Sequence, residues 1–270
     1  MLRSDEWFQN VRLGARDVAM SKCQLYLISP LDVGGAFPEM LAGALDAHGT
    51  YPPVAAFQFR VKGMDDHAAA LLAEPLQRIC AARDVAFIVN DSVSLAKRLG
   101  ADGVHLGQQD GDLREVRAYL GKDLQIGVTC HGSRHLALEA GEAGADYVAF
   151  GAFYPTTTKQ VVHTAKVALL RWWHVWSELP SVAIGGITLE NAAPLVEAGA
   201  DFLAVSAGVW QHPDGPEAAV AGFVKLMKEV RSFDPAEADL AAIMEELGEP
   251  LPGMDGAMDS ATDSAIDEAD

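Results

Sequence analysis

The chain has 270 residues, half of them hydrophobic, and a formal net charge of −18 at pH 7. This acidic balance disfavours binding to nucleic-acid phosphates, and no apolar run approaches the roughly 18 residues that span a membrane. The three cysteines are widely spaced and form no Cys-x-x-Cys pair, which argues against a disulfide framework or a zinc site. We therefore expect a globular, cytoplasmic protein without nucleic-acid or membrane partners.

Residues 1–21 precede the first strand pattern. This segment has mixed charge and no long apolar stretch, unlike a secretory signal. We expect an N-terminal extension that is helical, and Met20 is an alternative translation start.

Residues 22–231 alternate short apolar, β-rich runs with segments of helical spacing, and each run stops at polar or glycine residues. Eight such units predict an α/β protein with a closed parallel (β/α)8 TIM barrel, in which sites lie at the carboxyl ends of the strands. The expected strands are Gln24–Ile28, Val54–Arg60, Ala86–Val89, Gly103–Leu106, Gln125–Val128, Tyr147–Phe150, Val182–Ile184 and Phe202–Val205.

A Gly-Ala-Asp tripeptide recurs at 100–102, 144–146 and 199–201, each time between a helical segment and a strand. Glycine suits the left-handed position that ends a helix, and aspartate can organise the following turn. We interpret these residues as structural and place them at the opposite, amino-terminal face of the barrel.

The second strand ends in Gln58, Arg60 and Lys62. Alternate side chains of a strand share a face, so the three should point together toward the barrel mouth. Two cations and an amide can hold an anion. The alternative is an exposed strand end whose cations meet nearby acids.

Two carboxylates follow the next two strands, Asp91 beside Asn90 and Asp110 after a Gln-Gln pair. Mg²⁺ prefers one or two carboxylates together with waters and substrate phosphate oxygens. Asp91 could instead cap the helix near Ser92, and Asp110 or Asp112 could cap the next one.

The last three strand ends are suited to phosphate. Pro155–Lys159 brings three hydroxyls and an ammonium into a long loop. Ile184–Ile187 and Val205–Gly208 supply small residues where barrels often bind phosphate, although tight turns alone would also explain them.

Taken in order, QFRVK, VND, GADGVHLGQQD, IGVTCH, FGAFYPTTTK, AIGGI and VSAG resemble the motifs of the thiamine phosphate synthase (thiamine-phosphate pyrophosphorylase) family, over roughly residues 22–230. The resemblance implies a transferase of thiamine biosynthesis. Such an enzyme joins 4-amino-5-hydroxymethyl-2-methylpyrimidine diphosphate to 4-methyl-5-(2-hydroxyethyl)thiazole phosphate and releases thiamine phosphate and pyrophosphate. In this family the diphosphate leaves first, and the thiazole nitrogen captures the pyrimidine-stabilised cation.

The resemblance also implies a role for each matching residue. Thr129 stands where the family usually has a serine near the leaving group, and the last motif has glycine where a larger apolar residue is common. Catalytic roles fall on Arg60, Lys62, Thr129 and Lys159. The implied contacts are Mg²⁺ to Asp91 and Asp110, pyrophosphate to Arg60, Lys62, Asn90 and Lys159, the pyrimidine to Gln58, and thiazole phosphate to Thr156, Thr158, Gly186, Ser206 and Ala207.

Two other functions stay open. A thiazole tautomerase-like isomerase would bind thiazole phosphate but need no diphosphate site, and a non-catalytic regulatory paralogue would bind ligands without turnover. The charged strand ends that suit a diphosphate and Mg²⁺ favour the synthase over the isomerase.

Residues 232–270 contain twelve acidic residues and no lysine or arginine. Leu240, Ile243, Met244 and Leu247 have helical spacing, which predicts a short amphipathic helix within 235–247 that docks on the barrel or on a partner. A loosely attached solubilising tail is the alternative, and we expect disorder from Pro250 onward.

Two further patterns are ambiguous. His131 and His135 are four residues apart and could bind a metal on one helix face, but His131 could instead precede the helix and lie near substrate. Trp172, Trp173 and Trp176 should pack an outer helix against the barrel or a second subunit, which makes a homodimer possible.

Overall fold

The computed structural model describes residues 23–47, 54–156 and 163–248. The extension 1–21, the predicted site residues Thr158 and Lys159 and the end of the acidic tail lie outside the described residues. No helix in the described ranges is long and apolar enough to cross a membrane.

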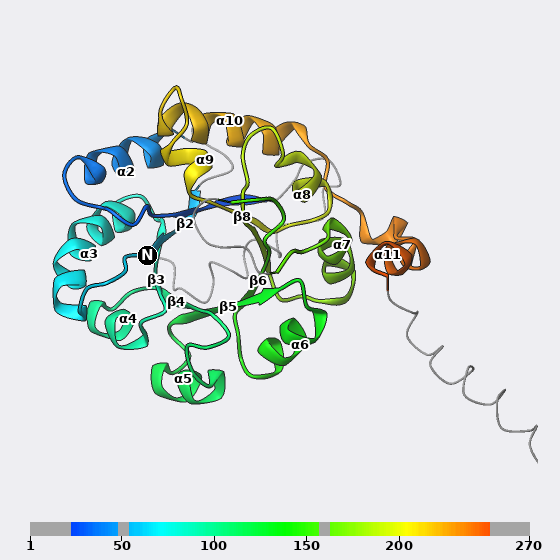
Figure 1. Ribbon diagram of the computed structural model, residues 1–270, viewed down its shortest axis with the longest axis horizontal. Helices are drawn as coiled ribbons and strands as arrows, with labels where there is room; N and C mark the ends of the chain where they lie inside the picture. Colours follow the sequence, from blue (N-terminus) through cyan, green and yellow to red (C-terminus); the bar gives the residue numbers. More distant parts are fainter. Residues whose placement is uncertain (1–22, 48–53, 157–162, 249–270) are drawn as a thin grey trace, which may run out of the picture.

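Eight parallel strands close into a barrel in chain order, and helices surround it (Figure 1), so the predicted (β/α)8 fold is confirmed. The strands are β1 (Gln24–Ile28), β2 (Val54–Phe59), β3 (Ala86–Asn90), β4 (Gly103–Leu106), β5 (Gln125–His131), β6 (Tyr147–Phe150), β7 (Ser181–Ile184) and β8 (Phe202–Val205). The helices are α2 (Phe37–Asp46), α3 (Asp66–Ala81), α4 (Val93–Leu99), α5 (Leu113–Leu120), α6 (Arg134–Glu142), α7 (Val167–Trp176), α8 (Ala193–Glu197), α9 (Ala207–Trp210), α10 (Pro216–Glu229) and α11 (Leu240–Leu247), with a 3₁₀ turn η1 (Pro235–Glu237) before α11.

The strands are buried on both faces, as expected when helices cover a parallel sheet. Outward side chains such as Leu25 and Phe57 belong to the large core between barrel and helices. Inward side chains such as Tyr26 and Tyr147 form a second, smaller cluster in the lumen. The alternation along each strand therefore decides which side chains approach the barrel mouth from inside.

Gly127 on β5 gives the ring of Tyr147 its place in the lumen. A Cβ atom at residue 127 would lie on the Tyr147 ring, whereas one at Gly141 in α6 would meet only Leu179 at 3.5 Å. The missing side chain on β5 thus lets an aromatic ring reach across the barrel.

We expect Gly127→Ala to lower the free energy of unfolding by about 1–3 kcal/mol, because the Tyr147 ring must leave its position in a packed core. Gly141→Ala is the matched control. It should be neutral or stabilise by about 0.5–1 kcal/mol, because alanine favours the helix and finds ordinary contacts. Urea unfolding of both variants checks this, and equal stability of the two would contradict the packing explanation.

The Gly-Ala-Asp repeats tie neighbouring strands together at the amino-terminal face. Gly100, Gly144 and Gly199 all have positive φ, which confirms the helix-ending role predicted for them. Each aspartate accepts a hydrogen bond from a backbone N–H at the start of the preceding strand: Asp102 from Phe87 at 2.7 Å, Asp146 from Ile126 at 2.7 Å and Asp201 from Ser181 at 2.8 Å. These three carboxylates are therefore structural, and the acids at the opposite rim are different residues.

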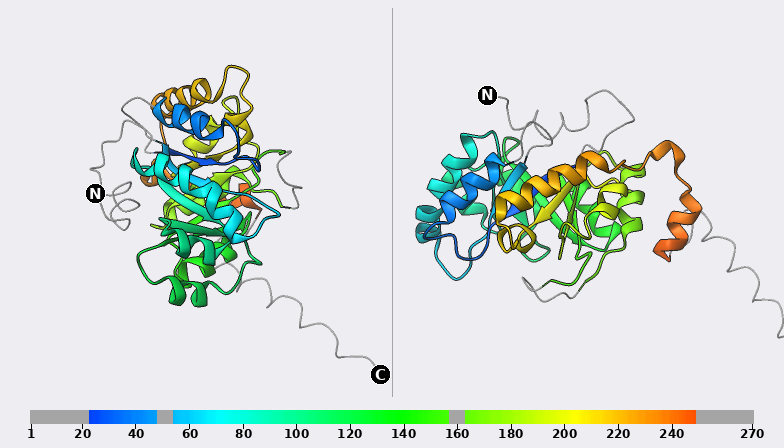
Figure 2. Two further views of the ribbon diagram at one scale, coloured as in Figure 1. Left: turned by 90° about the vertical axis from the view of Figure 1, so that its left-hand side faces the viewer. Right: turned by 90° about the horizontal axis from the view of Figure 1, so that it is seen from above.

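Helix α11 packs against α7 on the outside of the barrel, at the end of a connecting segment that follows α10 (Figures 1 and 2). Ile243 and Met244 are buried there. Lys166, which precedes α7, donates hydrogen bonds to the carbonyl oxygens of Glu246 and Leu247, both at 3.0 Å. Cations near the carboxyl end of a helix satisfy its last carbonyls. Within the described residues, the first part of the acidic tail is thus attached to the barrel.

We expect Ile243→Ala to release α11, because the truncated side chain loses buried apolar area worth about 2 kcal/mol or more. Amide hydrogen exchange should rise across 240–248 while the barrel strands keep their protection. Glu245→Ala, on the exposed face of the same helix, is the control and should leave exchange unchanged. Full protection of α11 in Ile243→Ala would contradict this docking.

Candidate active site

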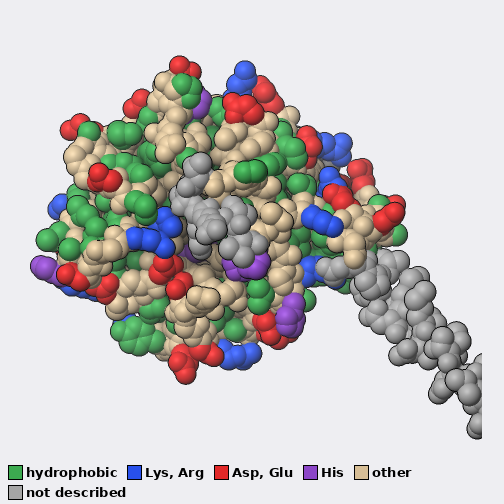
Figure 3. Space-filling view, viewed as in Figure 1, with side chains coloured by type: hydrophobic (Ala, Val, Ile, Leu, Met, Phe, Trp, Pro, Cys, Tyr) green, Lys and Arg blue, Asp and Glu red, His purple; other side chains and the backbone are tan. Residues whose placement is uncertain are grey.

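The polar strand ends gather at one rim of the barrel. Figure 3 shows this face: side chains of Lys or Arg lie directly beside Asp or Glu near its centre, and histidine lies close by. The rim combines the carboxyl ends of all eight parallel strands, where barrel sites are found.

Arg60 follows β2 and is fixed by its backbone. Its N–H donates to Ser29 Oγ at 2.9 Å, and the Ser29 hydroxyl donates to the Arg60 carbonyl at 3.2 Å. Ser29 is 1% exposed at the end of β1. Arg60 is half-buried at the rim. The hydrogen bonds that hold its backbone do not involve the guanidinium.

The three side chains predicted to share the barrel mouth, Gln58, Arg60 and Lys62, lie at different depths. Gln58 is 3% exposed and points into the lumen, whereas Lys62 lies beyond the strand end and is exposed. Phe59, between them in register, packs outward against Phe87. Gln58 therefore lies below the mouth, and the two cations lie at it.

Neither Asp91 nor Asp110 caps a helix. Ser92 caps α4 by accepting a hydrogen bond from Leu95 N at 3.1 Å, and Asp112 caps α5 by accepting one from Arg114 N at 2.8 Å. Asp110 instead closes the turn after β4, where its Oδ2 accepts a hydrogen bond from Gly107 N at 2.6 Å. The capping alternative is thus excluded for both carboxylates.

The carboxyl groups of Asp91 and Asp110 are near enough for the charge of Asp110 to act on Asp91. Loss of surrounding water, followed by the charge and hydrogen bond of Asp110, raises the pKa of Asp91, while the charges of Lys62 and Arg60 oppose the rise. Asp91 also has a left-handed backbone with φ of 65°, a conformation uncommon outside glycine. Two acids and two cations are therefore neighbours across β2, β3 and β4.

Thr129, on β5, faces the same rim from inside. Its hydroxyl lies 2.8 Å from Nε2 of His105 on β4, and its carbonyl accepts a hydrogen bond from Gln108 Nε2 at 2.6 Å. Burial lowers the pKa of His105 to about 4, and the charge of Asp110 opposes this shift. His105 is therefore neutral at pH 7.

The sequence did not predict a role for His105 or Ser29. The signals available in the sequence were the strand motif GVHL, which contains His105, and the end of the first strand, which Ser29 follows.

The loops after β6, β7 and β8 lie against one another. A Cβ atom on Gly186, whose φ is 65°, would lie on the backbone oxygen of Pro155, and one on Gly208 would lie on that of Ile187. Tyr154 N donates to the Gly185 carbonyl at 3.1 Å. These approaches bring Thr156, Gly186, Ser206 and Ala207 into one part of the rim, with Asn90 at the end of β3 on another.

His131 ends β5 rather than starting a helix, and its ring lies tilted against that of His163, with the ring centroids 4.4 Å apart. His135 lies in α6 and pairs with Glu139 at 3.4 Å. The two histidines do not share a helix face, so the metal-site alternative is wrong, and His131 precedes α6 as the other alternative held. No group of three or more metal-binding side chains occurs within the part of the chain that the structure describes.

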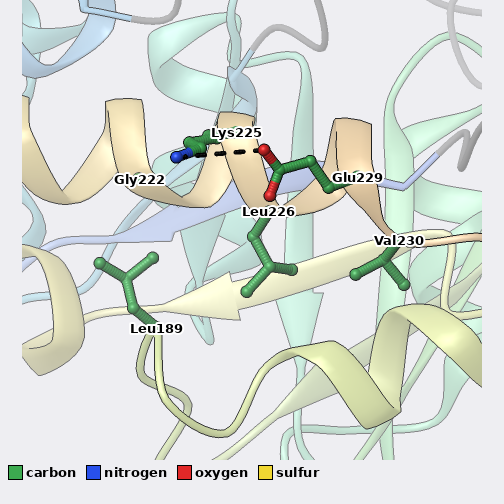
Figure 4. Close-up of a pocket in the computed structure, with 6 residues that line it drawn as sticks. All are labelled: Leu189, Gly222, Lys225, Leu226, Glu229 and Val230. Atoms are coloured by element: carbon green, nitrogen blue, oxygen red, sulfur yellow. Dashed lines mark ion pairs between the residues drawn. The ribbon is translucent and has the colours of Figure 1, made fainter.

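A shallow groove on the outer wall is separate from the rim. Figure 4 shows Leu189, Leu226 and Val230 pointing toward one another beside Gly222, with Lys225 and Glu229 paired at 4.0 Å. None of these residues was predicted to contact a ligand.

The closed barrel and the charged rim at the carboxyl ends of its strands define the class of protein. It is a (β/α)8-barrel protein with a polar site at its mouth. The model of a family described as thiamine monophosphate synthase matches residues 25–209. The chain therefore belongs to the thiamine monophosphate synthase family.

Individual relatives agree with this assignment. A thiamine-phosphate synthase of Erythrobacter litoralis is 63% identical over 204 residues, which cover 75% of this chain and 94% of the relative. One of Rhodospirillum centenum is 55% identical over 210 residues, covering 77% and 100%. A solved thiamine phosphate pyrophosphorylase from Pyrococcus furiosus superposes with a TM-score of 0.66 at 28% identity, covering 77% of this chain and 96% of that one.

Proposed function

We propose that the protein is a transferase of thiamine biosynthesis. It joins 4-amino-5-hydroxymethyl-2-methylpyrimidine diphosphate to 4-methyl-5-(2-hydroxyethyl)thiazole phosphate, and it releases thiamine phosphate and pyrophosphate. The observation that carries the proposal is the charged cluster of Arg60, Lys62, Asp91 and Asp110 at the rim of a chain 63% identical to a thiamine-phosphate synthase.

The chemistry needs little beyond binding and charge. When the diphosphate leaves as a polyanion, negative charge develops on its oxygens, and fixed cations stabilise that charge without a nucleophilic side chain. Arg60 supplies a planar fork for two oxygens and Lys62 a compact charge. In this proposal Asn90, Lys159 and the Thr129 hydroxyl complete the diphosphate contacts, and Gln58 holds the pyrimidine from below.

The acceptor substrate needs a second phosphate site. In our proposal Thr156 and Thr158 and the small residues Gly186, Ser206 and Ala207 hold the thiazole phosphate. The contacts among the loops after β6, β7 and β8 support this grouping. The thiazole nitrogen then faces the carbon that loses the diphosphate.

We further propose that Asp91 and Asp110 hold Mg²⁺. Two carboxylates brought together at a cost in repulsion, and free of any capping role, form the donor set that Mg²⁺ takes with waters and phosphate oxygens. Bound there, Mg²⁺ would neutralise charge on the leaving diphosphate. The two aspartates would hold it beside the two cations.

The test is product formation by the purified chain with both substrates and Mg²⁺. We expect pyrophosphate and thiamine phosphate in equal amounts, with neither formed when one substrate is omitted. Conversion of thiazole phosphate to an isomer without pyrophosphate would favour a tautomerase, and ligand binding without turnover would favour a regulatory paralogue.

We also propose a cytoplasmic location and a homodimer. The exposed Trp176, with 57% of its surface accessible, is the observation that favours a subunit contact. Light scattering coupled to size exclusion measures the mass and would give 28.7 kDa if the chain were a monomer.

A further inference from the structure

The turn after β7 is held against the turn after β6 at Gly185 and Gly186. Tyr154 N donates a hydrogen bond to the Gly185 carbonyl at 3.1 Å. A Cβ atom on Gly186 would lie on the backbone oxygen of Pro155, so the two turns touch there. Gly186 is one of the residues that we propose for the thiazole phosphate. The groups that hold this turn therefore decide the shape of the proposed phosphate site.

Asn191, at the far end of the turn after β7, closes it with both polar atoms of its side chain. Its Oδ1 accepts a hydrogen bond from Thr188 N at 2.8 Å, and its Nδ2 donates one to the Gly186 carbonyl at 2.9 Å. The Tyr154 hydroxyl donates to the Asn191 carbonyl at 2.7 Å. A backbone N–H can only donate and a carbonyl can only accept, so these partners also fix which end of the carboxamide is oxygen.

The two fixed carbonyls set the direction of two backbone N–H groups. The peptide bonds on both sides of Gly186 are trans, and in a trans peptide the N–H points opposite to the C=O of the same plane. The Gly185 carbonyl points to Tyr154 N, so the Gly186 N–H points away from it. The Gly186 carbonyl points to the Asn191 carboxamide, so the Ile187 N–H points away from that side chain.

These two N–H groups, of Gly186 and Ile187, donate to no acceptor within the ranges that the structure describes. Ile187 is 4% exposed, and backbone N–H groups of buried residues are nearly always paired. Gly186 has a φ of 65°, and successive N–H groups in such a turn form a concave binding site for anions. The turn is therefore built to receive an anion through its backbone.

We propose that Asn191 is a positioning residue of the thiazole phosphate site. By holding the Gly186 carbonyl, its carboxamide keeps the Ile187 N–H directed at the substrate phosphate, beside the Gly186 N–H. This inference rests on the proposed function for the identity of the substrate that carries the phosphate. No role for Asn191 was predicted from the sequence, and its effect is specific to one of the two substrates.

The first test detects the Ile187 N–H itself and needs neither substrate. The dipeptide Gly-Ile occurs once in the chain, at 186–187. When glycine carries ¹³C in its carbonyl and isoleucine carries ¹⁵N, a carbonyl–amide correlation spectrum of the full chain therefore contains one Gly-Ile signal. We expect inorganic phosphate to shift this amide proton downfield in a saturable way, and chloride at equal ionic strength to leave it in place. A signal that does not respond to phosphate would overturn the proposal.

The same signal tests the role of Asn191. Asn191→Ala removes both side-chain hydrogen bonds of the turn without adding charge, so we expect the Kd for phosphate to rise by about 10-fold or more. Gln77→Ala is the matched control. It removes a carboxamide that holds backbone carbonyls of Leu99 and Gly100, at the amino-terminal face, and should leave the Kd unchanged. An unchanged Kd in Asn191→Ala would overturn the proposal.

The two substrates separate positioning from a general loss of structure. We expect Asn191→Ala to raise KM for thiazole phosphate by about 10-fold or more and to change KM for the pyrimidine diphosphate by less than about 2-fold. Tyr154→Phe loses only the hydrogen bond to the Asn191 carbonyl, so it should raise the same KM by less. This variant provides the test if Asn191→Ala does not fold. Equal changes in both KM values, in step with Tm, would mean a structural role and overturn the proposal.

The inference and the proposed function fail in different ways. Absence of pyrophosphate release by the unmodified protein would refute the proposed function, while a phosphate-dependent Ile187 signal would still support the anion site. Pyrophosphate release together with an Ile187 signal that does not respond to phosphate would overturn the role of Asn191 and leave the proposed function standing.

Discussion

Arg60→Ala should lower kcat for pyrophosphate release by about 10²–10³-fold, the usual loss when one fixed donor to a developing anion is removed. The fold should survive, because Ser29 holds the Arg60 backbone and the guanidinium lies at the half-buried rim. Steady-state kinetics together with Tm measure both effects. Lys159→Ala should behave similarly.

Two further variants serve as comparisons for Arg60→Ala. Arg60→Lys should recover only part of the activity, because an ammonium lacks the planar fork that binds two oxygens. Lys225→Ala removes an equally charged side chain from the outer wall, where it pairs only loosely with Glu229 at 4.0 Å, and it should leave kcat unchanged. A near-normal kcat in Arg60→Ala would remove Arg60 from the reaction.

Asp91→Asn should lower kcat by about 10²–10³-fold and raise the Mg²⁺ concentration needed for half-maximal rate, because one of two charged ligands is lost. Asparagine tolerates the left-handed backbone that Asp91 adopts, so the loop should keep its shape. Kinetics over a Mg²⁺ series measures both quantities. Asp91→Asn and Asp110→Asn should not be additive if the two carboxylates share one ion.

Asp112→Asn is the matched control, two residues from Asp110. Asp112 caps α5, and asparagine caps helices as well as aspartate does, so neither stability nor Mg²⁺ dependence should change. If Asp91→Asn and Asp112→Asn gave the same Mg²⁺ dependence, the metal assignment would be wrong.

The barrel could be predicted from sequence because its signal is local. Each strand is a short apolar run bounded by glycine or polar residues, and each helix has its own periodicity. Only the bounds differ: β2 ends at Phe59 rather than Arg60, β3 and β5 continue to Asn90 and His131, and β7 begins one residue earlier, at Ser181. The first three differences lie at the rim, where the chain leaves the regular sheet.

The capping ambiguity could not be resolved from sequence. Asp91 precedes Ser92 and Asp110 precedes Asp112, and each residue in these pairs is a good helix cap. Which one caps depends on where the helix starts, and helix bounds are the least reliable part of a sequence prediction. The structure assigns the caps to the second residue of each pair and leaves the first at the site.

The hydrogen bonds among polar side chains of the lumen were hidden for a different reason. Tyr26, His105 and Tyr147 lie in three apolar strands, and each taken alone is typical of a core residue. Their hydrogen bonds join residues 121 and 42 positions apart, which no local pattern encodes. Similarly, the apolar spacing of α11 indicates a helix but not the surface of α7 that it covers.

The most direct test of the central claim is a crystal structure of the chain with Mn²⁺ and pyrophosphate, in which anomalous scattering locates the ion. We expect Mn²⁺ roughly 2.1 Å from carboxylate oxygens of Asp91 and Asp110, with pyrophosphate oxygens on the ion and on Arg60 and Lys62. An ion bound elsewhere, or pyrophosphate out of reach of both cations, would contradict a single rim site for the metal and the leaving group.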